Sequence, residues 1–267
     1  MLELCREIGM PEEVTREVLR LHHDPEFCPD ISCLTVESRW EQGLAEFTAA
    51  LGDDPRGFRM LCCMLRAALD AKAEYARLGL DHTIYIDTMG CFSRFVREHM
   101  ESFGSYGFDR GFWTVRQVSG KLFRIGQLEY ELTRRDGRPV ISLHIPTDVT
   151  LRTPLLRRSW EQATGLLGRV FPEYENAPIY CHSWLLSPTL ESLLPPESNI
   201  RRFQASFTVT PLPTPCTGVI QWVFKNVHLP PDRYPENTSL QRKLKAYLLS
   251  GGVFADAKGW LRPDPFR

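Results

Sequence analysis

The sequence has no hydrophobic run long enough to cross a membrane and almost no net charge. A membrane-spanning helix needs roughly 18 uninterrupted apolar residues, and no stretch of this 267-residue chain approaches that length. The 32 Lys and Arg are balanced by 33 Asp and Glu, whereas a dedicated duplex nucleic-acid binder needs excess positive charge to neutralise phosphates. We therefore expect neither a membrane nor a nucleic acid as a partner. With 43% hydrophobic residues, the chain can bury a substantial core.

We do not expect the start of the sequence to be a secretory leader. Glu3 and Glu7 occupy positions where a signal peptide would carry basic residues, and no apolar run follows them. The 8 cysteines are scattered along the chain, which favours reduced thiols, mostly buried, over a disulfide framework. These features predict a cytoplasmic protein.

A zinc site is not expected either. His22 and His23 are followed by Cys28 and Cys33, and these residue types can bind zinc. Neither pair has the close two-residue cysteine spacing that is typical of such sites. We therefore predict no metal ligand.

The first half of the chain has apolar residues at helical spacing. The pattern predicts four helices, which start at Pro11, Trp40, Pro55 and Thr88. Glycines follow the later ones at positions 52, 79 and 104, where they can act as C-terminal caps. We expect a helical N-terminal domain over 1–115.

From about Gly120 onward the apolar spacing shortens to two residues, which is typical of strands. The pattern predicts strands at 122–133, 139–146, 178–186, 202–210 and 219–225, and helices at 154–171 and 239–249. No repeat or low-complexity tract is present. The fold class is therefore predicted as α+β, with the helical domain followed by a second domain, 116–267, in which helices pack on a β-sheet.

The first of these strands changes phase in its middle. Phe123 and Ile125 share one face, whereas Leu128, Tyr130 and Leu132 lie on the other. A bulge at the intervening glycine, residue 126, would repair the phase. It would bring two carboxylates and a guanidinium together on the polar face.

Glu129, Glu131 and His144 form the first group of candidate catalytic residues. They lie on consecutive predicted strands, and a carboxylate or imidazole that faces a cleft can take a proton from a substrate amine. The alternative is that the two glutamates line a solvated sheet face and that His144 is a hydrogen-bonded core residue.

The predicted strand at 178–186 contains Cys181 beside His182, which suggests a nucleophile and its base. Adjacent strand residues point to opposite faces, so this pair cannot form a dyad unless the strand breaks. Tyr180, His182 and Trp184 share one face and could line a polar pocket. A packed histidine that holds a loop is the alternative for His182.

The junction between the His144 strand and the following helix is a candidate anion site. The helix is predicted to open at Pro154, and its first amide groups and the nearby Arg152, Arg157 and Arg158 would favour a phosphate. The alternative is an ordinary strand-to-helix junction that Thr and Asp side chains cap.

Several strings of residues together resemble a known family. They are Lys121-Leu122-Phe123-Arg124-Ile125-Gly126-Gln127-Leu128-Glu129, His144-Ile145-Pro146, His182-Ser183-Trp184-Leu185-Leu186, and Ser198-Asn199-Ile200 with Phe203. The chain resembles a bacterial acyltransferase-domain family with a helical N-terminal domain and a GNAT-like (N-acetyltransferase) C-terminal domain, which implies a mixed β-sheet with packed helices. The resemblance covers most of the chain.

The resemblance implies that acyl-CoA binds in an opening between the His144 strand and the His182 strand. Its pyrophosphate would lie against the start of the next helix. The residues expected to bind it are Val149, Thr150, Leu151, Arg152, Thr153 and Arg157. No permanently bound cofactor is implied, because acyl-CoA is a co-substrate.

The predicted function is N-acyl transfer from acyl-CoA to an amine on a small molecule or peptide, without a covalent enzyme intermediate. Glu129 is the first choice of base, with His144 or Glu131 next, and His182 or Tyr180 would donate a proton to the leaving thiolate. One alternative is a non-catalytic ligand-binding or sensor protein, because Thr, Val, Leu and Pro occupy a loop in which the family has spaced glycines. A second alternative is a thiol hydrolase that uses Cys181.

Overall fold

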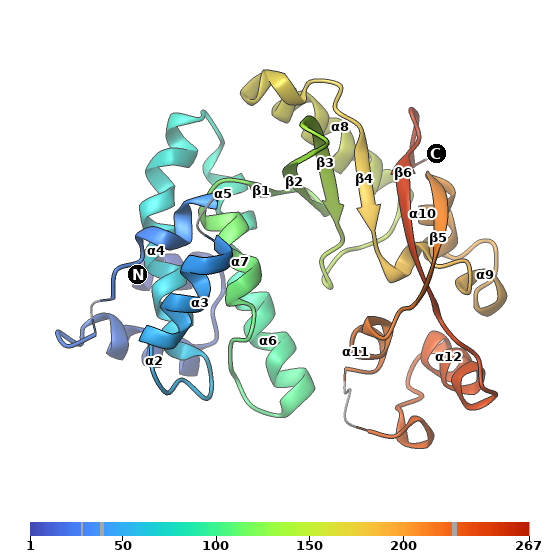
Figure 1. Ribbon diagram of the computed structural model, residues 1–267, viewed down its shortest axis with the longest axis horizontal. Coiled ribbons are helices and arrows are strands. Elements are labelled where there is room, and N and C mark those ends of the chain that lie inside the picture. Colours follow the sequence, from blue (N-terminus) through green and yellow to red (C-terminus); the bar gives the residue numbers. More distant parts are fainter. Residues whose placement is uncertain (28, 38–39, 226–228, 267) are drawn as a thin grey trace. The chain divides into compact units, whose positions relative to one another are not determined.

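The computed structural model describes residues 1–27, 29–37, 40–225 and 229–266. The chain divides into two compact units, Met1–Arg124 and Ile125–Arg267, whose elements are labelled in Figure 1. Helices dominate the first unit, and the second contains most of a mixed six-stranded sheet with helices packed on it. The predicted α+β fold class is therefore confirmed. None of the helices in the described ranges has the length and hydropathy that a membrane crossing requires.

The first unit is built around one long, central helix. Its elements are α1 (Leu2–Glu7), α2 (Glu12–His22), η1 (Ser32–Thr35), α3 (Trp40–Ala50), α4 (Phe58–Arg77), α5 (His82–Met89), α6 (Cys91–Phe103) and α7 (Gly111–Val118). Helix α4 contacts α2, α5 and α7, and its residues Leu61 to Leu65 are fully buried. The four predicted helices correspond to α2, α3, α4 and α6, whereas the short helices α1, α5 and α7 were not predicted.

The start of α4 is fixed by side-chain capping and by a glycine. Asp54 accepts hydrogen bonds from the backbone N–H groups of Arg59 and Met60 at 3.1 and 2.9 Å. Gly57, just before the helix, has a φ of 70°, and a Cβ there would lie 1.8 Å from the backbone oxygen of Phe108. Only glycine fits this position, because it lacks a Cβ and tolerates a positive φ.

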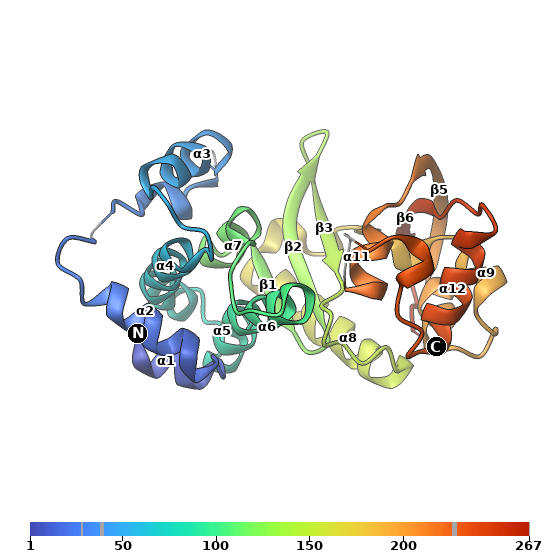
Figure 2. The same ribbon diagram turned by 90° about the horizontal axis from the view of Figure 1, so that it is seen from below.

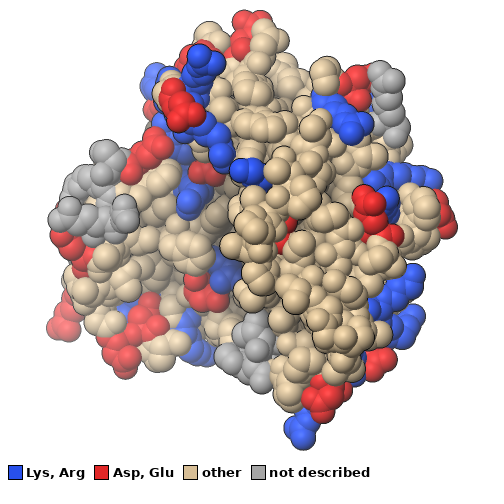
Figure 3. Space-filling view, turned by 45° about the vertical axis from the view of Figure 1, so that its right-hand side comes forward, with Lys and Arg blue, Asp and Glu red and all other residues tan. Residues whose placement is uncertain are grey.

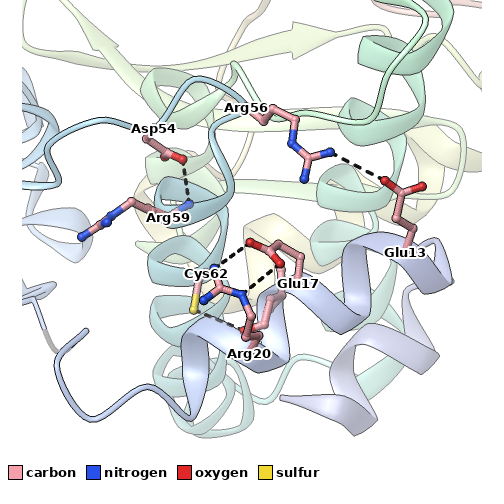
Figure 4. A network of polar contacts seen from close by, with 8 residues as sticks. Glu13, Glu17, Arg20, Asp54, Arg56, Arg59 and Cys62 are labelled. Carbon is pink, nitrogen blue, oxygen red and sulfur yellow. Dashed lines mark hydrogen bonds and ion pairs between the residues drawn. The ribbon is translucent and has the colours of Figure 1, made fainter.

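Charged side chains tie α2 to the segment that precedes α4 (Figure 4). Arg56 reaches Glu13 at 3.7 Å, and Arg20 pairs with Glu17 within α2 at 2.8 Å. Beneath them, the Cys62 thiol donates to the backbone oxygen of Val18 at 3.8 Å. Burial raises the pKa of the Cys62 thiol to about 11, which agrees with the prediction that most cysteines are buried, protonated thiols.

The sheet has the strand order β1-β2-β3-β4-β6-β5. Its strands are β1 (Leu122–Ile125), β2 (Leu128–Arg135), β3 (Arg138–His144), β4 (Ile179–His182), β5 (Phe207–Pro215) and β6 (Ala255–Leu261). Strands β3 and β4 pair in parallel, and the pairs β2–β3, β4–β6 and β5–β6 are antiparallel. The mixed sheet that the resemblance implied is therefore present.

Two tight turns shape the first three strands. A two-residue turn at Gly126-Gln127 separates β1 from β2, so the predicted single strand with a bulge at Gly126 is wrong. Gly126 has a φ of 64°, and its Cα lies so close to Ser159 that a Cβ would be 3.1 Å from that side chain. The β2–β3 hairpin, prominent in Figure 2, turns at Asp136-Gly137, where both φ values are positive, as a type I′ turn requires.

One face of the sheet is apolar and is covered by helix α8 (Thr153–Val170). Leu156, Ala163 and Leu167 of α8 are fully buried. The buried Ser159 hydroxyl accepts from the backbone N–H of Leu128 at 3.2 Å and contacts the Tyr130 hydroxyl at 3.1 Å. It also donates to the backbone oxygen of Ile125. Helix α8, which was predicted, therefore fixes the β1–β2 turn.

The segment between β4 and β6 forms a second, smaller core. Its elements are η4 (Trp184–Leu186), α9 (Leu190–Leu193), α10 (Asn199–Ala205), α11 (Gly218–Phe224), η5 (Pro231–Arg233) and α12 (Ser239–Leu249), and η3 (Pro172–Tyr174) precedes β4. Leu190, Val219, Phe224 and Leu244 pack together there. The predicted strand at 219–225 is wrong, because Val219, Val223 and Phe224 are buried at helical rather than alternate spacing.

Three further predictions near this segment need correction. The predicted strand at 178–186 ends at His182, and the chain then turns into η4. The predicted strand at 202–210 begins only at Phe207, because Ser198 caps α10 by accepting from the Arg201 N–H at 3.2 Å. Strand β6 was not predicted at all. Its buried residues are Ala257 and Gly259, which are too small to give a strong strand signal.

Charged residues of both signs are interspersed on the surface in Figure 3, which shows one face of the molecule. No extended area of positive charge is visible on that face.

Candidate active site

The strand register places all five predicted catalytic residues on one face of the sheet. Paired residues share a face, and so do alternate residues along a strand. Glu129 pairs with His144 and Glu131 with Ser142, Ser142 pairs with Tyr180, and His182 pairs with Lys258. We call the side that carries these residues the polar face, and it is opposite to the face covered by α8.

The polar face carries its two histidines at equivalent positions on neighbouring parallel strands. The parallel pairing runs from Ile141–Ile179 to Ser142–Tyr180. His144 ends β3 and His182 ends β4, each two residues beyond that last pair. The two imidazoles therefore lie at the edge of the sheet where the hydrogen-bonded ladder of these strands has ended.

His144 forms a hydrogen-bonded pair with a carboxylate. Its Nε2 lies 2.8 Å from Glu131 Oε2, with side chains that are 21% and 14% exposed. A carboxylate that accepts from Nε2–H leaves Nδ1 as the proton acceptor and fixes the ring's orientation. Glu129 lies directly opposite His144 but is only 3% exposed, so His144 is the more accessible of the two.

His182 forms a second pair, with a carboxylate that was not predicted. Its Nε2 lies 2.7 Å from Asp256 Oδ2, with side chains that are 51% and 19% exposed. Asp256 belongs to β6, and it was missed because that strand was missed. The signal in the sequence was weak, since only the alternation of Ala257 and Gly259 marks the strand.

Tyr180 is held tightly by its neighbours on the polar face. Its ring contacts Trp260 edge to face at 5.2 Å between centroids, and the Arg135 guanidinium stacks 3.6 Å from its centroid. The ring is almost fully buried. This packing favours a supporting role for Tyr180, and its role as proton donor stays a prediction.

The predicted phosphate loop lies between β3 and α8. The Val149 N–H donates to Pro146 O at 3.2 Å, and the Thr150 N–H donates to Gln127 Oε1 at 2.7 Å. Two of the predicted amides therefore already bond within the protein. Leu151 and Arg152 come just before α8, and Thr153 begins its first turn, where amides have no partner within the helix.

Of the predicted cations, Arg157 is partly neutralised. Its Nε donates to Glu161 at 3.0 Å, and its terminal nitrogen lies 3.4 Å from Asp264. Arg152 is exposed at the N-terminal cap of α8. The positive charge nearest the start of the helix is therefore that of Arg152.

The remaining sequence candidates differ in their surroundings. The Cys181 thiol is completely buried, and burial raises its pKa well above its usual range, so it is not a thiolate nucleophile. It lies on the apolar face, opposite to His182, as the strand geometry predicted. Among the described residues there is no group of three potential metal ligands, and Cys28 of the dismissed zinc motif lies outside them.

Comparison with known proteins places this architecture in a family. Residues 122–261 match the family described as the GNAT-like C-terminal domain, and the chain belongs to that family. Residues 1–120 match the N-acyltransferase N-terminal domain. The resemblance read from the sequence is therefore confirmed. A comparison with curated proteins finds no significant match.

Solved structures with the same fold include two complexes of an acyltransferase. One contains decanoyl-CoA and teicoplanin, and the other contains CoA and 10C-teicoplanin. Each is 24% identical to this chain with a TM-score of 0.81, and the match covers 97% of this chain and 86% of the other. A third structure, an acyltransferase with decanoyl-CoA, is 22% identical with a TM-score of 0.80 and the same coverage. At this level of identity the likeness establishes the fold.

Proposed function

We propose that this protein is an N-acyltransferase that moves an acyl group from acyl-CoA directly to an amine. The observation that carries the proposal is the pair of histidine–carboxylate contacts at equivalent ends of β3 and β4, His144 with Glu131 and His182 with Asp256. Family membership and the acyl-CoA complexes of the structural neighbours support the same reaction. Two such pairs on one polar face favour catalysis over a purely ligand-binding role.

In this mechanism His144 is the general base. With Glu131 accepting from Nε2–H, its Nδ1 takes a proton from the neutral acceptor amine as the nitrogen lone pair attacks the thioester carbonyl. A C–N bond forms, the tetrahedral intermediate collapses, and the C–S bond breaks. His182 in its imidazolium form gives a proton to the departing thiolate. Glu129 was the first choice of base, and its burial makes His144 the better candidate.

The start of α8 would hold the diphosphate of acyl-CoA. Because α8 follows β3 directly, its first turn lies at the same edge of the sheet as His144 and His182. The amides of Leu151 to Thr153 and the guanidinium of Arg152 supply positive potential there. We infer that these groups bind the phosphates and that Arg157, already paired with carboxylates, contributes less.

The acceptor is an amine on a small molecule or peptide. The teicoplanin complex of the structural neighbour suggests that such proteins accommodate a large acceptor and a medium-length acyl chain. A cytoplasmic location and a domain boundary after residue 115 remain part of the proposal. Decanoyl-CoA and acetyl-CoA are the donors to try first.

The reaction can be tested directly by calorimetry and thiol release. Acyl-CoA binding is expected in the micromolar to millimolar range, and an amine acceptor should trigger release of free CoA, measured with a chromogenic disulfide. His144→Gln should lower kcat by about 10²- to 10⁴-fold with little change in acyl-CoA affinity.

His82→Gln is the matched control for that variant. His82 also contacts a glutamate, Glu7, at 2.9 Å, but it lies in the helical unit. Its substitution should leave kcat unchanged. The absence of any heat with several acyl-CoAs would refute the proposed function.

A further inference from the structure

Asp256 is held more rigidly than a surface aspartate. Its Oδ2 lies 2.7 Å from His182 Nε2, and its Oδ1 accepts from the backbone N–H of Ala257 at 2.8 Å. Both carboxylate oxygens are therefore engaged. The side chain is 19% exposed, so its orientation is restricted by these contacts rather than set by solvent.

A thiol lies near the same carboxylate. Cys216 precedes α11, and its backbone N–H donates to Phe254 O at 2.8 Å. Burial, with the nearby Asp256 charge as a further contribution, raises the pKa of the Cys216 thiol. The thiol therefore adds no second negative charge beside Asp256.

The strand register places several side chains beside His182 on the polar face. Lys258 of β6 lies directly opposite in the antiparallel register, Tyr180 is the next residue of β4 on the same face, and His144 ends β3 at the equivalent position. Asp256 supplies the carboxylate that hydrogen-bonds the imidazole. A carboxylate in this position fixes the tautomer of a histidine and stabilises its imidazolium form.

We propose that Asp256 is a positioning residue for acyl transfer, and that it holds His182 with Nε2–H toward the carboxylate and Nδ1 directed to the leaving thiolate. The proposal rests on the proposed function, in which His182 is the acid. As the C–S bond breaks, the electron pair stays on sulfur, the Nδ1 proton moves to it, and His182 returns to the neutral Nε2–H form. Asp256 remains ionised throughout.

The kinetic test compares Asp256→Asn with Glu236→Gln, using decanoyl-CoA and an amine acceptor. Glu236 pairs with Lys245 at 2.6 Å, so its variant loses an ion pair that belongs to the same unit but lies outside the sheet strands. Asp256→Asn should lower kcat by about 10-fold or more while KM for acyl-CoA changes less than about twofold.

A second measurement does not depend on turnover. In protein labelled with ¹⁵N-histidine, the His182 ring nitrogens, assigned with His182→Gln, should show the Nε2–H tautomer in the wild type at a pH where the ring is neutral, and a mixture of tautomers in Asp256→Asn. An unchanged tautomer, or an unchanged kcat, in Asp256→Asn would overturn the positioning role. Absence of acyl transfer in the wild type would instead refute the proposed function, whatever the tautomer.

Discussion

Replacing Ser159 with alanine should destabilise the second unit markedly, because one buried hydroxyl connects three groups. It accepts from the Leu128 N–H, contacts the Tyr130 hydroxyl and donates to Ile125 O. Its side chain is almost completely buried, so water cannot replace it without rearrangement. The polar groups left behind would pay a desolvation penalty of about 1–3 kcal/mol each.

Allowing for relaxation at the turn, we expect Ser159→Ala to lower the free energy of unfolding by about 2–4 kcal/mol. The assay is urea denaturation followed by circular dichroism, with the slope compared between variants to confirm two-state behaviour. Tyr130→Phe removes only one of the three contacts and should cost about 1 kcal/mol.

Thr164→Ala is the control on the same helix. Its hydroxyl is exposed and bonds only to backbone oxygens of its own helix, so its substitution should change the unfolding free energy by less than about 0.5 kcal/mol. A loss below about 1 kcal/mol for Ser159→Ala would show that the hydroxyl does not fasten α8 to the β1–β2 turn.

Three further outcomes are expected. Gly57→Ala should lower the free energy of unfolding by more than about 2 kcal/mol in a denaturant titration, because its Cβ would collide with Phe108 O and φ is positive; an unchanged midpoint would contradict this. Burial raises the pKa values of Cys62 and Cys63 to about 11 and about 12. Both thiols should therefore react with a thiol reagent at about pH 8 only as fast as the first unit opens. Modification at the rate of a free thiol would disprove their burial. Gln127→Ala should change the Kd for acyl-CoA by up to about tenfold, measured by calorimetry, because it releases a loop amide; an identical Kd would show that this amide lies away from the ligand.

The sequence predicted the parts of the fold that have strong local signals. Helix α8 begins where Pro154 predicts it, because proline at the first turn needs no N–H partner. The division between a helical first part and a mixed sheet also follows from the change in apolar period. Strand β6 was missed because its buried residues are Ala257 and Gly259, so its place in the sheet depends on partners distant in sequence.

The candidate site was predictable in the same partial way. Glu131 and His144 are on adjacent strands of a hairpin, and local alternation alone brought them to one face. The prediction that Glu129 and Glu131 share the polar face relied on a bulge at Gly126, but the structure has a turn there. The two glutamates share a face because they alternate along the separate strand β2. Asp256 could not be assigned to His182, because the sequence separates them by more than seventy residues and only the β4–β6 register joins them.

The topology explains why the candidate catalytic groups and the candidate phosphate loop meet despite the loop's unusual composition. In a parallel β3–α8–β4 unit the helix starts where the first strand ends, and the second strand ends at the same edge. His144, His182 and the first amides of α8 therefore share one edge, whatever residues fill the loop. The family's glycines would let phosphates approach the backbone over several residues, whereas here Gln127 occupies the Thr150 amide. Acyl-CoA binding should then depend more on the amides after Thr150 and on Arg152. We therefore expect Arg152→Ala to raise the Kd for acyl-CoA more than Arg157→Ala does. A larger rise for Arg157→Ala, measured by calorimetry, would contradict this arrangement.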